Sequence, residues 1–294
     1  LVWIKRRNGS AKDHCLVDVV RGPKKRLRSE SNAQETTEEV VTSFDPGGFT
    51  IGTDTGVNQS GYNFVAWNWA AGGAAVANTD GTISSQVSAN TDYGFSIVTY
   101  TGNGTAPSTV GHGLGAAPSL IFFKRRDTTS NWITYSSGIG ATKYLVLNNN
   151  GATTTDSGPF NNTAATSTVF TVNTFSDLNA NSGTYVAYCW SEVSGYSKFG
   201  SFTHSGAASS VSNLGFKPRF VLIKSTTSST TAQWMIFDSE RNTNDTIYAS
   251  SNAAENSGWA VVFEDNGFSW AAGSFGSADY IYAAFADRPG NNWD

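Results

Sequence analysis

The sequence predicts an all-β protein built from tandem antiparallel β-sandwich modules of jelly-roll-like organisation. Of its 294 residues, 13% are aromatic and only 14% are charged, and much of the remainder is Gly, Ser, Thr, Asn and Ala. Aromatic and β-branched residues favour strands, whereas clusters of Gly, Asn, Asp and Ser favour turns. Short apolar runs alternate with such clusters along the chain, which is typical of sandwiches. The same order of runs then recurs three times, which indicates tandem modules.

The repeat is anchored by a lysine that ends one apolar run and by an aromatic residue that ends the last run of each copy. Between them come a second strand-like run, an Asn-bearing turn and, in copies one and three, a Phe-to-Phe hairpin. The anchor pairs are nearly equally spaced in the three copies: Lys5 and Trp69, Lys124 and Trp190, Lys224 and Phe285. We therefore expect three structurally equivalent modules.

The module boundaries follow from a front strand that only two copies carry. It begins at Phe95 in the second copy and at Phe199 in the third, and the first copy has no equivalent. We therefore predict a truncated first module at residues 1–70, a second module at 94–193 and a third at 194–294. Residues 71–93 are poor in large apolar side chains, so we expect a linker or long surface loop there.

Individual elements can be predicted from local pattern. Residues 120–123 and 220–223 are continuous apolar runs, so these strands should be buried on both faces. Asp265-Asn-Gly267 lies between Phe263 and Phe268, and Asn-Gly is a strong signal for a hairpin turn. No segment carries the apolar stripe of an amphipathic helix. Seven tryptophans lie in strand-like runs and are expected in the core: Trp3, Trp67, Trp69, Trp132, Trp190, Trp234 and Trp270.

Charge and cysteine content exclude several classes of protein. The net charge of −4 implies no special partner, although nine of the 19 basic residues lie within residues 1–28. That basic segment could meet an anionic glycan or nucleic acid, but no aromatic residues interleave its run at Lys24, Lys25 and Arg26, so a solvated loop is favoured and no nucleic-acid partner is expected. Cys15 and Cys189 fit neither a disulfide framework nor a metal motif, and both are expected to be small core residues. No apolar stretch is long enough to span a membrane, so no membrane insertion is expected.

Three stretches in and just after the second copy carry further information. Residues 94–104 and 111–118, together with residues 185–200, resemble a β-rich module in tail-fibre-like and other virion proteins of bacteriophages, marine phages and cyanophages in particular. The resemblance covers residues 94–289, and residues 1–70 resemble a divergent, incomplete copy. It implies a place on a phage particle, in a tail appendage or on the capsid exterior, and it brings no catalytic motif.

Candidate catalytic and metal-binding groups are few. Gly111-His-Gly-Leu-Gly-Ala116 loosely fits a dinucleotide-binding fingerprint, but Pro118 and a β run follow it where a helix is required, so a turn is favoured. The three histidines are too far apart in sequence to suggest a metal site. Adjacent carboxylates on a strand point to opposite faces, so sequence neighbours do not form a hydrolytic pair. We expect neither catalytic residues nor a metal or other cofactor.

Candidate contact residues are therefore sought in loops. His112 is flanked by glycines and could be exposed, although a turn histidine is the simpler interpretation. Trp259 and Trp293 lie in polar surroundings and could stack on sugars, although packing is the simpler role. The candidate residues for contact with a glycan or a partner protein are therefore His112, Trp259, Trp293, Lys24, Lys25 and Arg26.

Taken together, the sequence predicts a phage virion structural protein that is not an enzyme. It would form part of a tail fibre or receptor-binding appendage, would act as a homo-oligomer (a trimer), and would contact host-surface polysaccharide as well as other virion proteins. The alternative is a capsid decoration or appendage scaffold with virion partners alone. A polysaccharide-degrading tailspike is the third interpretation.

Overall fold

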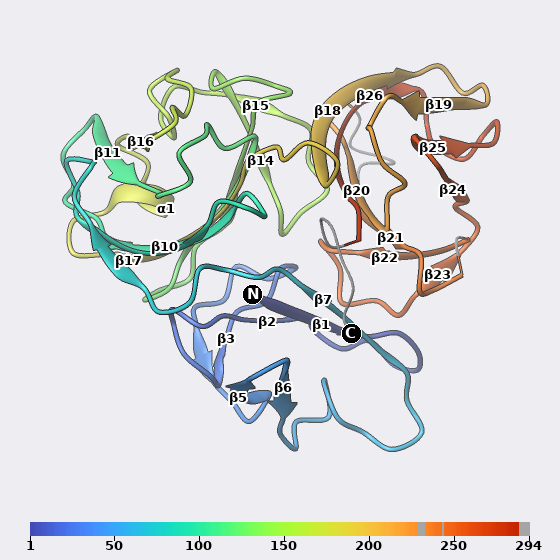
Figure 1. Cartoon of the computed structure of the whole chain (residues 1–294), viewed down its shortest axis with the longest axis horizontal. Coiled ribbons are helices and arrows are strands. Elements are labelled where there is room, and N and C mark those ends of the chain that lie inside the picture. The colour runs from blue at the N-terminus through green and yellow to red at the C-terminus, as the bar shows by residue number, and fades with distance from the viewer. Residues whose placement is uncertain (228–232, 243, 288–294) are drawn as a thin grey trace.

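Three β modules form three lobes around a common centre (Figure 1). The computed structural model describes residues 1–227, 233–242 and 244–287. Within these residues the only helix is the single turn α1 (Ser176–Asn179), and all strand pairs between named strands are antiparallel. The predicted all-β class is confirmed.

The first module, residues 1–70, has the smallest sheets. Its three-stranded sheet has the order β2-β1-β7, and two-stranded pairs β3-β4 and β5-β6 complete it. The strands are β1 (Val2–Arg6), β2 (Cys15–Val17), β3 (Lys25–Arg26), β4 (Thr36–Thr37), β5 (Val41–Asp45), β6 (Gly48–Ile51) and β7 (Phe64–Asn68).

The second module is built on an eight-stranded sheet of order β15-β14-β13-β12-β17-β10-β9-β8, faced by the pair β11-β16. Its strands are β8 (Val76–Asn78), β9 (Ser85–Asn90), β10 (Phe95–Thr101), β11 (Ser108–Gly111), β12 (Leu120–Arg125), β13 (Trp132–Ser136), β14 (Lys143–Val146), β15 (Thr154–Thr155), β16 (Val169–Val172) and β17 (Thr184–Trp190). The linker expected at residues 71–93 is a wrong prediction, because β8 and β9 extend this sheet beyond β10. Small and polar residues suffice there because β8 is the edge strand of the sheet and β9 lies next to it.

The third module combines a six-stranded sheet, β18-β26-β20-β21-β22-β23, with a three-stranded sheet, β19-β25-β24. The strands are β18 (Ser197–His204), β19 (Ser209–Ser212), β20 (Phe220–Ser225), β21 (Trp234–Asp238), β22 (Asp245–Tyr248), β23 (Asn256–Ser257), β24 (Val261–Glu264), β25 (Gly267–Trp270) and β26 (Ala278–Phe285). The predicted hairpin is confirmed, since Phe263 pairs with Phe268 and Glu264 with Gly267.

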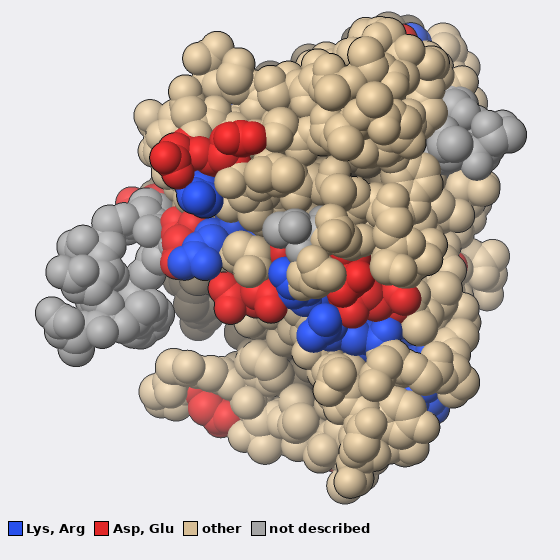
Figure 2. Space-filling model, turned by 90° about the vertical axis from the view of Figure 1, so that its right-hand side faces the viewer, with Lys and Arg blue, Asp and Glu red and all other residues tan. Residues whose placement is uncertain are grey.

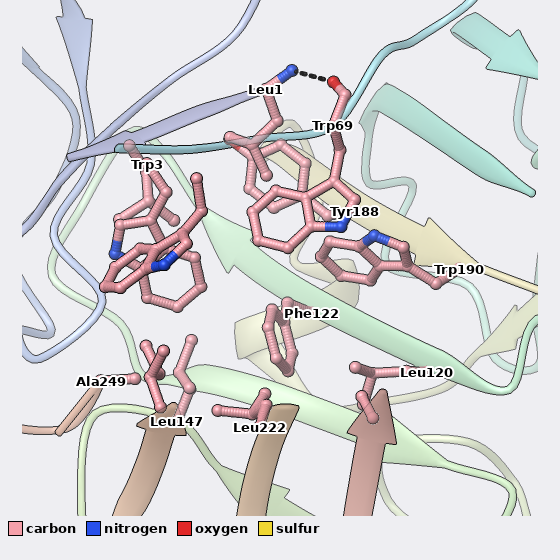
Figure 3. Close-up of a cluster of buried hydrophobic side chains, with 14 of the residues drawn as sticks. Leu1, Trp3, Trp69, Leu120, Phe122, Leu147, Tyr188, Trp190, Leu222 and Ala249 are labelled. Carbon is pink, nitrogen blue, oxygen red and sulfur yellow. Dashed lines mark hydrogen bonds between the residues drawn. The ribbon is translucent and has the colours of Figure 1, made fainter. Parts of the chain in front are cut away.

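The continuous apolar runs are explained by two different cores on the two faces of one strand. On β12, Phe122 faces a core shared by all three modules, whereas Ile121 and Phe123 face the core of the second lobe. Successive strand residues point to opposite faces, so a strand between two cores must be apolar throughout. We call the shared core the hub; Trp3 and Leu222 occupy it as equivalents of Phe122 (Figure 3).

The hub holds most of the tryptophans that the sequence placed in the core. Trp69 packs against Trp190, Phe220 and Phe285 with ring centroids 5.4–5.8 Å apart. All seven predicted core tryptophans are at most 7% exposed. Both cysteines are free and buried, as expected.

Candidate functional site at the module junctions

Each module contacts the next in the same way, and the third contacts the first, so the modules form a closed ring. The indole Nε1 of Trp132 donates to the carbonyl of Arg28 in the first module at 2.8 Å, and that of Trp234 donates to Val146 in the second at 3.0 Å. His14 takes this position in the first module, with Nε2 3.1 Å from the carbonyl of Tyr248 in the third. Equivalent residues thus meet at three junctions, 1/2, 2/3 and 3/1, named here by the modules that they join.

A buried lysine crosses every junction. Lys5 donates to the carbonyl of Asn252 at 3.3 Å, Lys124 to that of Asn32 at 3.2 Å, and Lys224 to that of Gly151 at 2.8 Å. All three side chains are fully buried. Burial lowers the pKa of Lys5 and Lys124 to about 8 and that of Lys224 to about 7, because the charged ammonium loses hydration.

Junction 1/2 is held by a buried network of charges. Glu35 of the first module accepts hydrogen bonds from Arg21 of its own module at 2.9 Å and from Arg126 of the second at 3.0 Å. Arg21 also pairs with Asp18, which accepts a hydrogen bond from the hydroxyl of Tyr188 in the second module at 2.7 Å. Burial opposes ionisation of Asp18, but the neighbouring Arg21 guanidinium keeps the pKa of this carboxyl below its usual value.

Junction 3/1 repeats this network. Glu255 of the third module accepts from Arg241 at 2.6 Å and from Arg7 of the first module at 2.9 Å. Asp238 pairs with Arg241 at 2.6 Å and accepts from the indole of Trp67 at 2.9 Å. Trp67 therefore takes the role that Tyr188 has at junction 1/2.

Junction 2/3 has none of these charges. Thr153 and Thr226 replace the Glu and Arg that meet at the other junctions; the amide and hydroxyl of Thr153 donate to the carbonyl of Thr226 at 2.9 and 3.1 Å. Ser136 stands where the other modules have Asp18 and Asp238, and Ala283 stands where they have Tyr188 and Trp67. A cavity of about 10 Å³ lies between Ser136 and Ala283, the smallest space that could hold one water molecule.

A larger polar groove opens at the outer side of junction 2/3. It has a volume of about 510 Å³ and is lined by residues of both modules: Gly138, Ile139, Lys143, Thr153, Ser201, Phe202, Thr203, Thr226, Thr227, Asp279, Tyr280 and Ile281. We call it the junction groove. The Thr203 hydroxyl donates to the Asp279 carboxylate at 2.6 Å, and the Asp279 amide donates to the Thr227 hydroxyl at 3.0 Å.

The groove has two charged side chains that can meet a ligand. The Phe202 ring packs on Tyr280 and Trp270 in the core of the third lobe, on the opposite face of β18 from the side chains of Ser201 and Thr203. Lys143 is exposed and makes no ion pair with any residue that the structure describes, and Asp279 is the single carboxylate of the lining. The groove can therefore offer an amine, a carboxylate and several hydroxyls to one polar molecule.

The structure does not gather the residues that the sequence suggested for contact. His112 is fully buried, with Nε2 3.1 Å from the carbonyl of Thr166, so it is not exposed as a contact residue would be, and it lies in a turn, as the favoured interpretation has it. The Gly111–Gly115 turn that holds it is followed by β12, so the turn interpretation of the Gly-rich stretch is confirmed. Trp259 is partly buried and stacks on Phe275 at 6.0 Å, which is a packing role. Trp293 lies outside the described residues.

The basic segment is neutralised by its own module. Lys24 pairs with Glu39 and Arg26 with Glu38, both at 2.7 Å, and Lys25 donates to the Thr37 hydroxyl at 2.9 Å. Arg26 is 5% exposed. On the face shown in Figure 2, basic and acidic atoms lie side by side in a band and form no patch of one sign. The segment is therefore part of the architecture of the first module.

The carboxylates and histidines offer little for catalysis. Glu38 and Glu39 are ion-paired, Asp238 is tied to Arg241, and Glu264 accepts a hydrogen bond from Ser269 at 2.6 Å. His14 is fully buried, and burial lowers its pKa to about 3. Among the described residues, no group of three or more His, Cys, Asp or Glu side chains could hold a metal ion. No helix in this part of the chain is long and apolar enough to cross a membrane.

Comparison with known proteins gives one match, to a domain of unknown function, DUF7483, over residues 1–289. The chain belongs to this family. The match runs through all three modules. No curated protein and no solved structure matches the chain.

Sequence reasoning missed the junction groove of this DUF7483 chain, although the repeat contained a signal. Copies one and three share Asp-x-x-Arg at residues 18–21 and 238–241 and a Glu at 35 and 255, whereas copy two has Ser136, Ile139 and Thr153. Three coordinated departures in one copy mark a junction that differs from the other two. The sequence alone could not show that these positions meet, because the partners lie in different modules.

Proposed function

We propose that the chain is a structural component of a bacteriophage virion, in a tail fibre or other receptor-binding appendage, and that it binds host-surface glycans in the junction groove. The phage location rests on the sequence resemblance of residues 94–289. The glycan-binding role rests on the groove, and this is the observation that carries the proposal. A homo-oligomer, such as a trimer, would present several grooves at once and gain avidity from weak individual contacts.

The groove suits a sugar because of the chemistry that it combines. Sugars carry hydroxyls that both donate and accept hydrogen bonds, together with apolar C–H faces. Asp279, Lys143 and the threonine hydroxyls supply acceptors and donors for the hydroxyls of a sugar. These groups belong to two modules that pack together through the hub. Because their relative positions are fixed by this packing, the site is largely preformed.

We propose binding without turnover. Hydrolysis of a glycosidic bond by the usual route needs two carboxyl groups about 5–10 Å apart on either side of the bond. The described lining of the groove includes a single carboxylate, Asp279, so this pair of carboxyl groups is not present there.

The test is glycan-array binding of the full chain, followed by titration of the best ligand against variants. Asp279→Asn and Lys143→Ala change exposed groups of the groove and should each weaken binding by about tenfold, roughly 1.4 kcal/mol. Asp265→Asn and Lys217→Ala are matched controls, because this exposed pair lies at the tip of the third module. Equal binding by groove and control variants would place the glycan site elsewhere. No binding to any glycan, with the chain located on the capsid, would favour the decoration or scaffold role.

A further inference from the structure

A second polar groove lies on the second module, at the place that corresponds to the third-module side of the junction groove. It has a volume of about 220 Å³, and six polar side chains line it: Ser84, Gln86, Thr99, Thr101, Arg126 and Thr184. We call it the β9 groove, because β9 forms its outer wall. The third module has no such wall, since its six-stranded sheet ends at β18.

The register of the strands shows how the two grooves correspond. The amide of Arg126 donates to the carbonyl of Thr184 at 2.8 Å, as the amide of Thr226 donates to that of Asp279 at 2.7 Å. Thr184 and Asp279 each pair directly with a threonine of the front strand. The β9 groove therefore has a hydroxyl where the junction groove has a carboxylate, and a cation where the junction groove has a hydroxyl.

The lining side chains stand on the side of the sheet that faces the hub. Thr99 pairs with Gln86 on one side and with Val186, a hub residue, on the other. Residues that pair directly across an antiparallel ladder point to the same face of the sheet. Tyr100 belongs to the other face and to the core of the second lobe, and Ser85 pairs with it. These two residues therefore present only their backbone to the groove.

Most polar groups of the β9 groove are free to meet a ligand. Five of the side chains make no hydrogen bond to any residue that the structure describes: Ser84, Gln86, Thr99, Thr101 and Thr184. In the junction groove, by contrast, the hydroxyls of Thr153, Thr203 and Thr226 already donate within the protein. The hydroxyls of the β9 groove can therefore both donate to a ligand and accept from it.

Arg126 supplies the single charge of this lining. Its Nε and Nη2 donate to the two carboxylate oxygens of Glu35, both at 3.0 Å, and its side chain is 23% exposed. This bidentate pair fixes the plane of the guanidinium, and Nη1 makes no hydrogen bond to any described residue. Asp127, which accepts from the amide of Thr184, is paired with Arg125 at 2.9 Å. An anion at Nη1 would thus meet no carboxylate of the lining.

We propose that the β9 groove binds a sugar unit that carries a carboxylate or sulfate group. The anionic group would accept from Nη1 of Arg126, since a guanidinium is well suited to planar or multidentate anions. The sugar hydroxyls would bond to Thr101, Thr184 and Gln86. Neighbouring strands lie about 4.8 Å apart, so groups on β10 and β17 are within reach of one sugar ring. The site is separate from the junction groove and does not require that a glycan binds there.

The test compares two probes by isothermal titration with the full chain: the trisaccharide of galacturonic acid and its methyl ester. The ester keeps the hydroxyls of the acid and loses its charges. The acid should bind about tenfold more tightly than the ester. This difference should shrink when NaCl is raised from about 50 mM to about 500 mM, because salt screens exposed charges.

Two variants locate the acid in the β9 groove. Arg126→Lys keeps a cation for Glu35 but removes Nη1, and it should weaken binding about tenfold. Thr101→Val removes an exposed hydroxyl that has no structural partner, and it should weaken binding about threefold. Thr155→Val is the matched control, an exposed strand threonine of the same module outside both grooves. If Arg126→Lys lowers the urea midpoint, Thr101→Val decides the test.

The outcomes also separate this site from the proposed glycan site. Loss of acid binding in Lys143→Ala, with none in Thr101→Val, would place the acidic sugar in the junction groove. That result would overturn the β9 site and support the proposed function. Equal binding of acid and ester would overturn the role of Arg126 as the anion-binding group. No binding of the acid at millimolar concentration would overturn the proposal, whether or not another glycan binds in the junction groove.

Discussion

Two junctions of the ring are joined by buried charges and the third by hydroxyls. Junctions 1/2 and 3/1 each contain an Asp, two Arg and a Glu, with Tyr188 or Trp67 inserted from the neighbouring module. At junction 2/3 the corresponding positions hold small or uncharged side chains. A buried charge left without its partner is costly, so such a network is expected to change as a set. The difference shows how one repeat can keep its packing and still vary a junction enough to open a groove.

The largest effect is expected from Asp18→Ala, measured as the free energy of unfolding in urea. The change removes the carboxylate that pairs with Arg21 and leaves a buried guanidinium short of a partner, which should cost about 3–5 kcal/mol. Ser136→Ala is the matched change at junction 2/3 and should cost less than about 1 kcal/mol, since Ser136 Oγ accepts a single hydrogen bond. Equal losses would mean that the charges do not distinguish the junctions.

A smaller loss is expected from Glu35→Gln. Glu35 bridges Arg21 and Arg126, and the amide keeps the shape but loses the charge, so about 1.5–3 kcal/mol of stability should be lost. At junction 2/3, Thr153→Val deletes a hydroxyl that makes one hydrogen bond, and about 1 kcal/mol is expected. If Thr153→Val lowers the free energy of unfolding more than Glu35→Gln does, the charged junction 1/2 is not the more strongly stabilised of the two.

Junction 2/3 can also be given the missing charges. Thr153→Glu alone places a carboxylate beside an uncharged residue and should destabilise the chain. Thr226→Arg in the same chain should recover part of the loss, with a coupling energy of about 0.5–3 kcal/mol in a double-mutant cycle. A coupling energy near zero would show that the two positions do not approach as their counterparts at 35 and 126 do.

The smallest effect is the pH dependence that the junction lysines contribute. Burial lowers the pKa of Lys224 in the folded chain, so between its folded value of about 7 and its unfolded value near 10.5 the unfolded chain holds more protons. Stability from this group therefore rises with pH across that window. The urea midpoint of the native chain, compared with that of Lys224→Met, should show the native chain gaining more stability between pH 8 and pH 9. If the urea midpoints of the native chain and of Lys224→Met changed equally between pH 8 and pH 9, the result would contradict the burial of a titrating lysine at this junction.

Much of the fold followed from local pattern. The strands, the hairpin at 263–268 and the core tryptophans were predicted because apolar periodicity and turn chemistry act within a few residues. The strands β8 and β9 were not, because edge strands need few apolar side chains and residues 76–90 look like a loop. The closure of the ring also escaped prediction, since contacts such as Lys5 with Asn252 join residues far apart in sequence.

The sequence did not predict the residues of the candidate site. Burial of His112 could not be foreseen from its flanking glycines, because Gly113 and Gly115 at φ values of 71° and 69° serve the turn and leave the histidine inside. The basic segment gave the appearance of a binding surface because its acidic partners, Glu38 and Glu39, lie beyond it in the sequence. Pairing across a fold decides whether a charge is available to a ligand.

The contact between the first and third modules also has a consequence for the order of events during synthesis. Lys5 and Arg7 are made before the second and third modules, and their partners Asn252 and Glu255 leave the ribosome only after the whole second module and more than half of the third. Contacts this far apart in sequence form late and slowly. Until then, Lys5 stays in water as an ordinary charged lysine and the face of Trp3 and Trp67 is uncovered. The nascent first module is thus the part of this chain most in need of protection by a chaperone.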